Sequence, residues 1–137
     1  PYASGVEAWP TVDAAFVERV RNDSNWRVVD ARAPERYAGE SEPIDPVAGH
    51  IPGAHNLYWQ SQLAAGGKLS DIDVLRARYQ ALLGGVPPER VVCYCGSGVT
   101  ACHLLLAMDA CGLRGAQLYV GSWSEWCRAG EGAIGAS

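Results

Sequence analysis

Apolar positions along the chain fall into short runs that are separated by polar segments rich in glycine or proline. Three of these runs contain many β-branched or aromatic residues and predict buried strands, over residues 26–30, 91–94 and 116–120. A fourth, short strand is expected to follow the turn that starts at residue 49 and to end at Leu57. A fifth is expected around residues 5–8.

Between the strands, apolar residues recur every three to four positions, which is the spacing of an amphipathic helix. The expected helices cover residues 11–22, 34–38, 58–63, 70–83, 99–112 and 122–126. Thr11 would cap the first of them, and Ser70 and Ser122 each stand three residues before an acidic residue, as in a capping box. Segments 39–48 and 64–69 contain prolines or glycines and are expected to be loops.

Alternating strands and helices predict an α/β fold with a mostly parallel sheet. In such sheets, binding sites gather beyond the C-terminal ends of the strands. Residues 30–36 and 95–100 each follow a strand end, so we expect them to face one crevice.

Composition and charge narrow the class of protein. With 137 residues, of which 48% are apolar, the chain is long enough for a single domain with one core. A net charge of −4 argues against nucleic acid or an anionic membrane as the main partner. The five cysteines are an odd number without a disulfide-framework spacing, which favours a reducing, cytoplasmic environment.

Cys95 stands where the central predicted strand ends. It is followed by glycines at positions 96 and 98 and by an apolar helix that starts at Val99. This order places the thiol near a helix N-terminus, where unpaired N–H groups and the helix dipole favour an anion. A thiolate is such an anion, so we interpret Cys95 as a nucleophile.

Other cysteines are expected to be structural. Cys93 lies inside the strand, and Cys102 and Cys111 lie within the apolar helix, where thiols are usually inert packing. Their spacing with His103 fits no standard zinc pattern, so neither a metal nor another cofactor is expected. His50 is expected to bond backbone groups at the turn that follows it.

Four short segments carry a more specific signal: Val29–Arg32 with Glu35–Tyr37, Gly49–Ala54, Cys95–Thr100 and Gly121–Trp126. In this order they resemble the rhodanese family of sulfurtransferases, in particular the C-terminal catalytic domain of its tandem-domain members. The resemblance implies a rhodanese-like fold with a five-stranded sheet flanked by helices. It also implies a ping-pong reaction in which Cys95 takes a sulfane sulfur, becomes a persulfide and passes the sulfur to a thiol or cyanide.

The same resemblance assigns the site residues. Arg36 matches the family's donor-binding arginine. Backbone amides of the loop after Cys95, with two hydroxyl groups, would hold the anionic donor; these residues are Gly96, Ser97, Gly98, Val99 and Thr100. Asp30 and Arg32 are expected to form a structural pair that braces the neighbouring loop.

The loop sequence bears on the donor. Family members specialised for thiosulfate tend to have basic residues directly after the cysteine, whereas Gly96–Gly98 resembles the 3-mercaptopyruvate type. Those enzymes often carry a second arginine before the turn at Gly49, and residues 43–48 contain none. Both donors therefore stay open.

The resemblance also implies a domain arrangement. Residues 1–137 form one catalytic domain, with 1–9 as a linker-like start and 129–137 as a small polar tail. We expect an N-terminal rhodanese-like domain in the natural protein, and Trp59 is a candidate for the exposed face that this partner would cover.

Two other functions compete with sulfur transfer. Cysteine-dependent phosphatases and arsenate reductases need an arginine six residues after the cysteine to clamp an oxyanion, and position 101 is alanine. A non-catalytic rhodanese-like regulatory or binding module is the second alternative. Such modules commonly lack the cysteine, so the complete loop at Cys95 argues against it.

Overall fold

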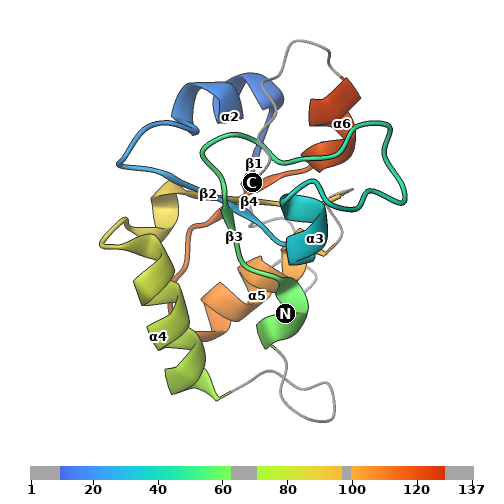
Figure 1. The fold of residues 1–137 in the computed structure, drawn as a ribbon. Helices are drawn as coiled ribbons and strands as arrows, with labels where there is room; N and C mark the ends of the chain where they lie inside the picture. The colour runs from blue at the N-terminus through green and yellow to red at the C-terminus, as the bar shows by residue number, and fades with distance from the viewer. Residues whose placement is uncertain (1–9, 63–70, 97–99, 129–137) are drawn as a thin grey trace.

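The fold is a five-stranded parallel sheet with helices on both faces, as the alternation of elements predicts. The computed structural model describes residues 10–62, 71–96 and 100–128. Its sheet has the order β1-β5-β4-β2-β3, and every neighbouring pair of strands is parallel (Figure 1). The strands are β1 (Thr11–Val12), β2 (Arg27–Asp30), β3 (His55–Asn56), β4 (Val91–Tyr94) and β5 (Gln117–Tyr119).

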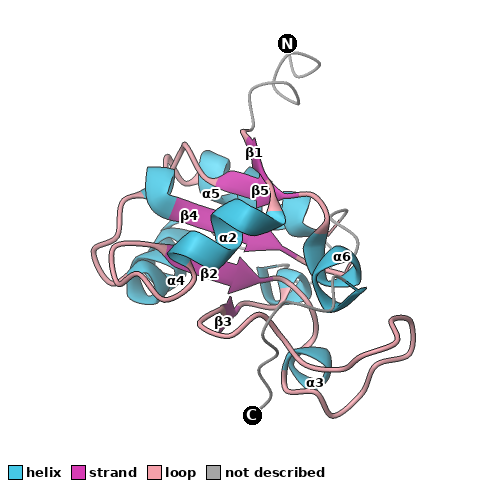
Figure 2. Cartoon of the chain, turned by 90° about the horizontal axis from the view of Figure 1, so that it is seen from above, coloured by secondary structure: helices cyan, strands magenta, loops and turns pink. Residues whose placement is uncertain are grey.

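Five α-helices and two 3-10 turns connect these strands within the described residues. They are α2 (Ala14–Val20), α3 (Pro34–Tyr37), η1 (Trp59–Gln62), α4 (Ile72–Leu83), η2 (Pro88–Arg90), α5 (Ala101–Ala110) and α6 (Ser122–Arg128). None of the described helices is long and apolar enough to cross a membrane. Seen from above, α2 and α6 lie on one side of the sheet and α4 and α5 on the other (Figure 2).

The sheet separates two apolar clusters, and β4 contributes to both. Val91 and Cys93 pack with the residues of α4 and α5, whereas Val92 and Tyr94 pack with those of α2 and α6. Side chains of a strand alternate between the two faces, so a central strand that is covered on both faces must be apolar throughout. This burial fixes β4, and with it the position of Cys95 at its C-terminal end.

Two predicted starts of helices need correction. Thr11 does not cap α2: it lies in the edge strand β1, paired with Leu118 of β5, because two β-branched residues extend the sheet there. The cap is Asp13, whose carboxylate accepts the N–H of Phe16 at 2.9 Å. At α4 the cap is Asp71, and Ser70 lies outside the described residues, as do the strand expected at 5–8 and the loop at 64–69.

The loop from α3 to β3 ends in a tight turn at residues 49–54, which packs against the end of α2. Its Gly53 has φ +95°, and a Cβ built there would lie 2.1 Å from the carbonyl oxygen of Arg21. The preceding Ile51 donates its N–H to the Tyr94 hydroxyl at 3.1 Å. His50 stacks on the ring of Tyr37 and bonds that residue's carbonyl at 2.7 Å. The turn is therefore anchored to the sheet and to two helices.

Replacing Gly53 with alanine should destabilise the fold by about 3 kcal/mol, because it adds a backbone clash to the cost of a positive φ. Gly85→Ala is the matched control: its φ is +92°, but no atom lies within 4 Å of the added Cβ. The control should cost about 1 kcal/mol. Urea unfolding of both variants measures the difference, and equal losses would contradict the clash.

Candidate active site

Cys95 directly follows β4 and is held by the start of α6. Its N–H donates to the Ser122 hydroxyl at 3.1 Å, and its carbonyl accepts the N–H of Trp123 at 2.9 Å. The next carbonyl, of Gly96, accepts the N–H of Ser124 at 2.9 Å. Cys95 is 1% exposed and packs in the cluster under α4 and α5. Three consecutive residues of α6 thus fix the main chain on both sides of the thiol.

Ser122 has a different role from the one its sequence context predicts. It is fully buried with φ +55°, and its hydroxyl donates to the carbonyl of Tyr119 at 2.9 Å while it accepts the N–H of Cys95. The carboxylate of Glu125 accepts the Tyr119 hydroxyl at 2.7 Å. The capping box expected at Ser122 is therefore wrong, because the serine faces the Cys95 loop and the glutamate faces a tyrosine.

The loop between Cys95 and α5 is described only at its two ends. Ser97, Gly98 and Val99 lie outside the described residues. Thr100 is the N-cap residue of α5, and its carbonyl accepts the N–H of His103 at 3.0 Å. The ten-residue helix α5 thus begins six positions after Cys95.

Arg36 of α3 lies against this loop. A Cβ built on Gly96 would lie 3.3 and 3.4 Å from the two terminal nitrogens of the Arg36 guanidinium. The cation is thus in contact with the residue that follows Cys95, although the two residues are far apart in the sequence. The structure brings the ends of β2 and β4 together, as the topology of a parallel sheet predicts.

Two acidic residues that the sequence analysis missed hold Arg36. Its Nη2 donates to Glu42 at 2.9 Å and lies 3.6 Å from the carboxylate of Asp45. Burial acts to raise the pKa of Glu42, but the N–H of Asp45 and the Arg36 guanidinium outweigh it and lower this pKa below its ordinary value. The signal available in the sequence is the set of three acidic residues in segment 39–48, which loop composition alone does not connect to Arg36.

Asp30 and Arg32 form a buried pair at the end of β2. The Nη2 of Arg32 donates to Asp30 at 2.7 Å and to the carbonyl of Gly49 at 2.7 Å. Its other terminal nitrogen, Nη1, lies 3.4 Å from Glu42, which links this pair to Arg36. Arg32 therefore connects β2 to the turn before β3.

Burial acts on the thiols of the other four cysteines. Burial, together with the charges of Cys95 and Cys102, raises the pKa of Cys93 to about 12. Burial is also the main cause that raises the pKa of Cys102, Cys111 and Cys127. These four thiols are protonated at neutral pH. No disulfide joins any of the five cysteines, all of which lie in the described residues.

Trp59, the candidate for the face that a partner domain would cover, is partly exposed. It is half-buried against the cluster under α4 and α5, and its ring stacks on His103 with centroids 4.6 Å apart. The fold places it there because its N–H bonds the carbonyl of Ala31 at 3.0 Å, which draws η1 onto the end of β2.

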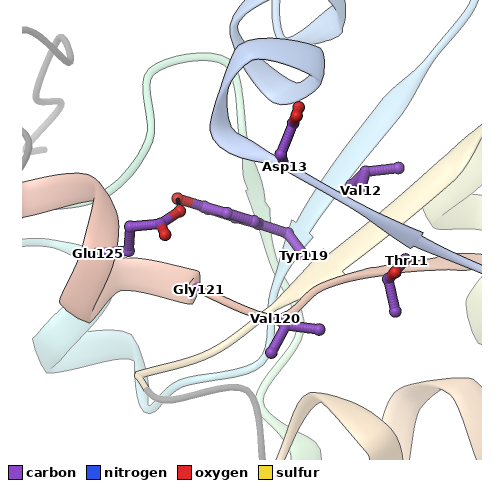
Figure 3. Close-up of a pocket in the computed structure, with 7 residues that line it drawn as sticks. All are labelled: Thr11, Val12, Asp13, Tyr119, Val120, Gly121 and Glu125. Atoms are coloured by element: carbon purple, nitrogen blue, oxygen red, sulfur yellow. Dashed lines mark hydrogen bonds between the residues drawn. The ribbon is translucent and has the colours of Figure 1, made fainter.

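A pocket of about 500 Å³ opens at the ends of β1 and β5 (Figure 3). The Tyr119 side chain extends toward Glu125 at one side of it, and Asp13 projects from the start of α2 (Figure 3). None of the described residues among those predicted for the site lines this pocket. Within the described part of the chain, no group of three or more His, Cys, Asp or Glu could hold a metal ion.

The sequence profile of the rhodanese-like domain matches residues 13–129, which include Arg36, Cys95 and the start of α6. The chain belongs to the rhodanese-like domain family. Its five-stranded parallel sheet, with Cys95 at the end of the central strand, is thus the sheet of a rhodanese-like domain.

Curated relatives of this rhodanese-like domain are named as sulfurtransferases. A probable 3-mercaptopyruvate sulfurtransferase of Pseudomonas aeruginosa is 47% identical over 115 residues, which cover 84% of this chain and 40% of the relative. Human 3-mercaptopyruvate sulfurtransferase is 35% identical over 123 residues, covering 84% and 41%. Rat thiosulfate sulfurtransferase is 37% identical over 106 residues, covering 75% and 35%. The chain thus spans well under half the length of these relatives.

Solved structures show the same fold. The Tum1 protein of Saccharomyces cerevisiae superposes with a TM-score of 0.77 at 26% identity, covering 93% of this chain and 46% of Tum1. An anaerobic ergothioneine biosynthesis enzyme from Chlorobium limicola gives a TM-score of 0.81 at 19% identity, covering 93% and 32%. At that identity the second likeness concerns the fold alone.

Proposed function

We propose that this chain is the catalytic domain of a sulfurtransferase in which Cys95 carries the sulfur as a persulfide. The observation that carries the proposal is the contact of the Arg36 guanidinium with Gly96, 3.3 Å from its Cβ position. A fixed cation therefore lies beside the candidate nucleophile, where an anionic donor would need it. The names of the curated relatives support the same activity.

The reaction has two displacements. In the first, the Cys95 thiolate attacks the sulfane sulfur of the donor, so that an Sγ–S bond forms as the donor's bond to that sulfur breaks. With thiosulfate the leaving group is sulfite, which keeps the electron pair of the broken bond. With 3-mercaptopyruvate the leaving group is the enolate of pyruvate, which takes up a proton. In the second, cyanide or a thiolate attacks the outer sulfur and returns the Cys95 thiolate.

The parts of the site have distinct roles in this proposal. Arg36 binds the donor's anionic group, and a guanidinium can do so with two parallel N–H groups. Backbone amides from Gly96 to Thr100, with the hydroxyls of Ser97 and Thr100, stabilise the negative charge on the departing donor and on the persulfide. Asp30 and Arg32 keep the end of β2 in place. The thiolate itself gains from the nearby start of α5.

The donor is proposed to be 3-mercaptopyruvate or thiosulfate. Relatives named for each donor are similar to this chain, and the loop Gly96–Gly98 has no basic side chain. Among the described residues, Arg36 is the arginine in contact with Gly96, and one guanidinium suits one anionic group, which is the carboxylate in 3-mercaptopyruvate.

Treatment with either donor should add 32 daltons to Cys95, because the sulfane sulfur is transferred to its thiolate. Intact-protein and peptide mass spectrometry measure the adduct. Cys95→Ser should remove the adduct and the turnover while leaving the fold intact, whereas the control Cys102→Ser should retain both. An adduct on folded Cys95→Ser, or none on the unaltered protein, would refute the proposal.

Arg36→Ala should lower kcat/KM for the donor about 100-fold, mainly through KM, because a charged hydrogen-bond donor is lost. Arg36→Lys should lower it about tenfold, since an ammonium cannot reproduce two parallel N–H bonds. Steady-state assays with both donors test this order. Arg19→Ala, which removes an exposed arginine from α2, should leave the kinetics unchanged. Unchanged kinetics in Arg36→Ala would place donor binding elsewhere.

The proposal includes a second rhodanese-like domain on the N-terminal side in the natural protein. Its support is the share of the relatives that this chain spans, 40% for the Pseudomonas protein and 41% for the human one. Such a domain would restrict solvent at the Cys95 loop and help to hold the donor. We expect a higher kcat/KM for the full coding product than for the 137-residue chain. Equal values, with the shorter chain monomeric, would argue against this domain.

A further inference from the structure

Glu42 and Asp45 lie beside Arg36, and the reaction proposed above gives neither of them a role. Their side chains are only 5% and 1% exposed. Glu42 is held by its own loop, since its Oε2 accepts the N–H groups of Ile44 and Asp45 at 3.2 and 3.0 Å. Asp45 is held by α6, since its Oδ1 accepts the Ser124 hydroxyl at 2.8 Å and lies 3.1 Å from Arg128. Both carboxylates therefore have fixed positions.

These carboxylates belong to a chain of alternating charges next to the Cys95 loop. Ion-pair distances of 2.7, 3.4, 2.9, 3.6 and 3.1 Å link its members in the order Asp30, Arg32, Glu42, Arg36, Asp45 and Arg128. Three negative and three positive groups give a net charge of zero. An anion beside Gly96 thus meets the Arg36 guanidinium within a row whose charges sum to zero.

The ion pairs around Arg36 leave two buried polar atoms without a hydrogen bond. The Nε of Arg36 and the Oδ2 of Asp45 are buried without a hydrogen-bond partner in the described structure. Leaving buried polar groups unpaired is unfavourable, and such groups call for an explanation. The guanidinium of Arg36 faces Gly96, and its nearest nitrogen lies 3.6 Å from the carboxylate of Asp45, beyond hydrogen-bond distance.

We propose that Glu42 and Asp45 are positioning residues that hold Arg36 over the Cys95 loop and reduce the positive potential there, so that the site favours a donor with one negative charge. This inference rests on the proposed function and deepens it. The attraction by Arg36 and the repulsion by the two carboxylates are both proportional to the charge of the ligand, so the carboxylates take away twice as much binding energy from a dianion as from a monoanion. The extra attraction that an isolated guanidinium would give to a dianion is thereby largely removed. The predicted preference is for a mercapto-carboxylate over thiosulfate.

The test removes one carboxylate charge and measures the potential at Cys95 directly. In Glu42→Gln, the amide oxygen can still accept the backbone N–H groups, but the negative charge is gone. The rates of Cys95 alkylation by iodoacetate, an anion, and by neutral iodoacetamide are followed on the Cys95 peptide. Their ratio cancels changes in thiol access, and a merely structural role would not raise it.

In Glu42→Gln the iodoacetate-to-iodoacetamide ratio should rise about fivefold. The kcat/KM ratio of thiosulfate to 3-mercaptopyruvate should rise by a similar factor. Glu40→Gln is the matched control, because it removes the same charge from an exposed position in the same loop and should change neither ratio. Asp45→Asn is the second variant, with the same expected direction, should Glu42→Gln fail to fold.

An alkylation ratio that is unchanged or lower in the folded variants would overturn the inference, and so would an equal rise in Glu40→Gln. These outcomes differ from failure of the proposed function, which would appear as the absence of a 32-dalton adduct on the unaltered protein with both donors. The alkylation rates measure the potential at Cys95 even if the protein forms no persulfide.

Discussion

The site depends on the hydrogen bonds between the start of α6 and the main chain after β4. Ser122 accepts the N–H of Cys95, Trp123 donates to its carbonyl, and Ser124 donates to the carbonyl of Gly96. A strand that ends leaves its next polar groups without a ladder partner, and buried groups of this kind must be paired. Because α6 pairs them, the thiol has a defined place at the end of the central strand.

The same turn of α6 also holds the loop that carries the carboxylates. The indole N–H of Trp123 donates to the carbonyl of Val47 at 2.8 Å, and the hydroxyl of Ser124 donates to Asp45. Trp123 is fully buried, and the guanidinium of Arg32 lies 5.0 Å from its ring. Trp123 and Ser124 thus use their backbone N–H groups to bond Cys95 and Gly96, and their side chains to bond Val47 and Asp45 of the loop before β3. Both segments are therefore held by the same turn of α6.

Charge is the second organising feature of the site. Buried ion pairs are weak evidence for stability, because desolvation offsets much of their attraction. A row of six charged groups, five of them with side chains at most 19% exposed, is better explained by the orientation it gives to Arg36 and by the potential it sets beside Gly96. The neutral balance of this row distinguishes the site from an open cluster of basic residues, which would attract any anion according to its charge.

The sequence by itself determined the fold class, the central strand, the position of Cys95 at its end and the motif that includes Arg36. These features follow from local patterns, because apolar runs, glycine turns and the order of residues are already visible in the sequence. The sequence patterns gave wrong predictions at Thr11 and Ser122. Local propensity favours helix caps at both positions, but Thr11 pairs with β5 and the Ser122 hydroxyl bonds the N–H of Cys95, which is distant in the sequence. Only the tertiary structure showed that Glu42 and Asp45 surround Arg36, because the burial and the distances that decide an ion pair depend on how α3, its loop and α6 pack together.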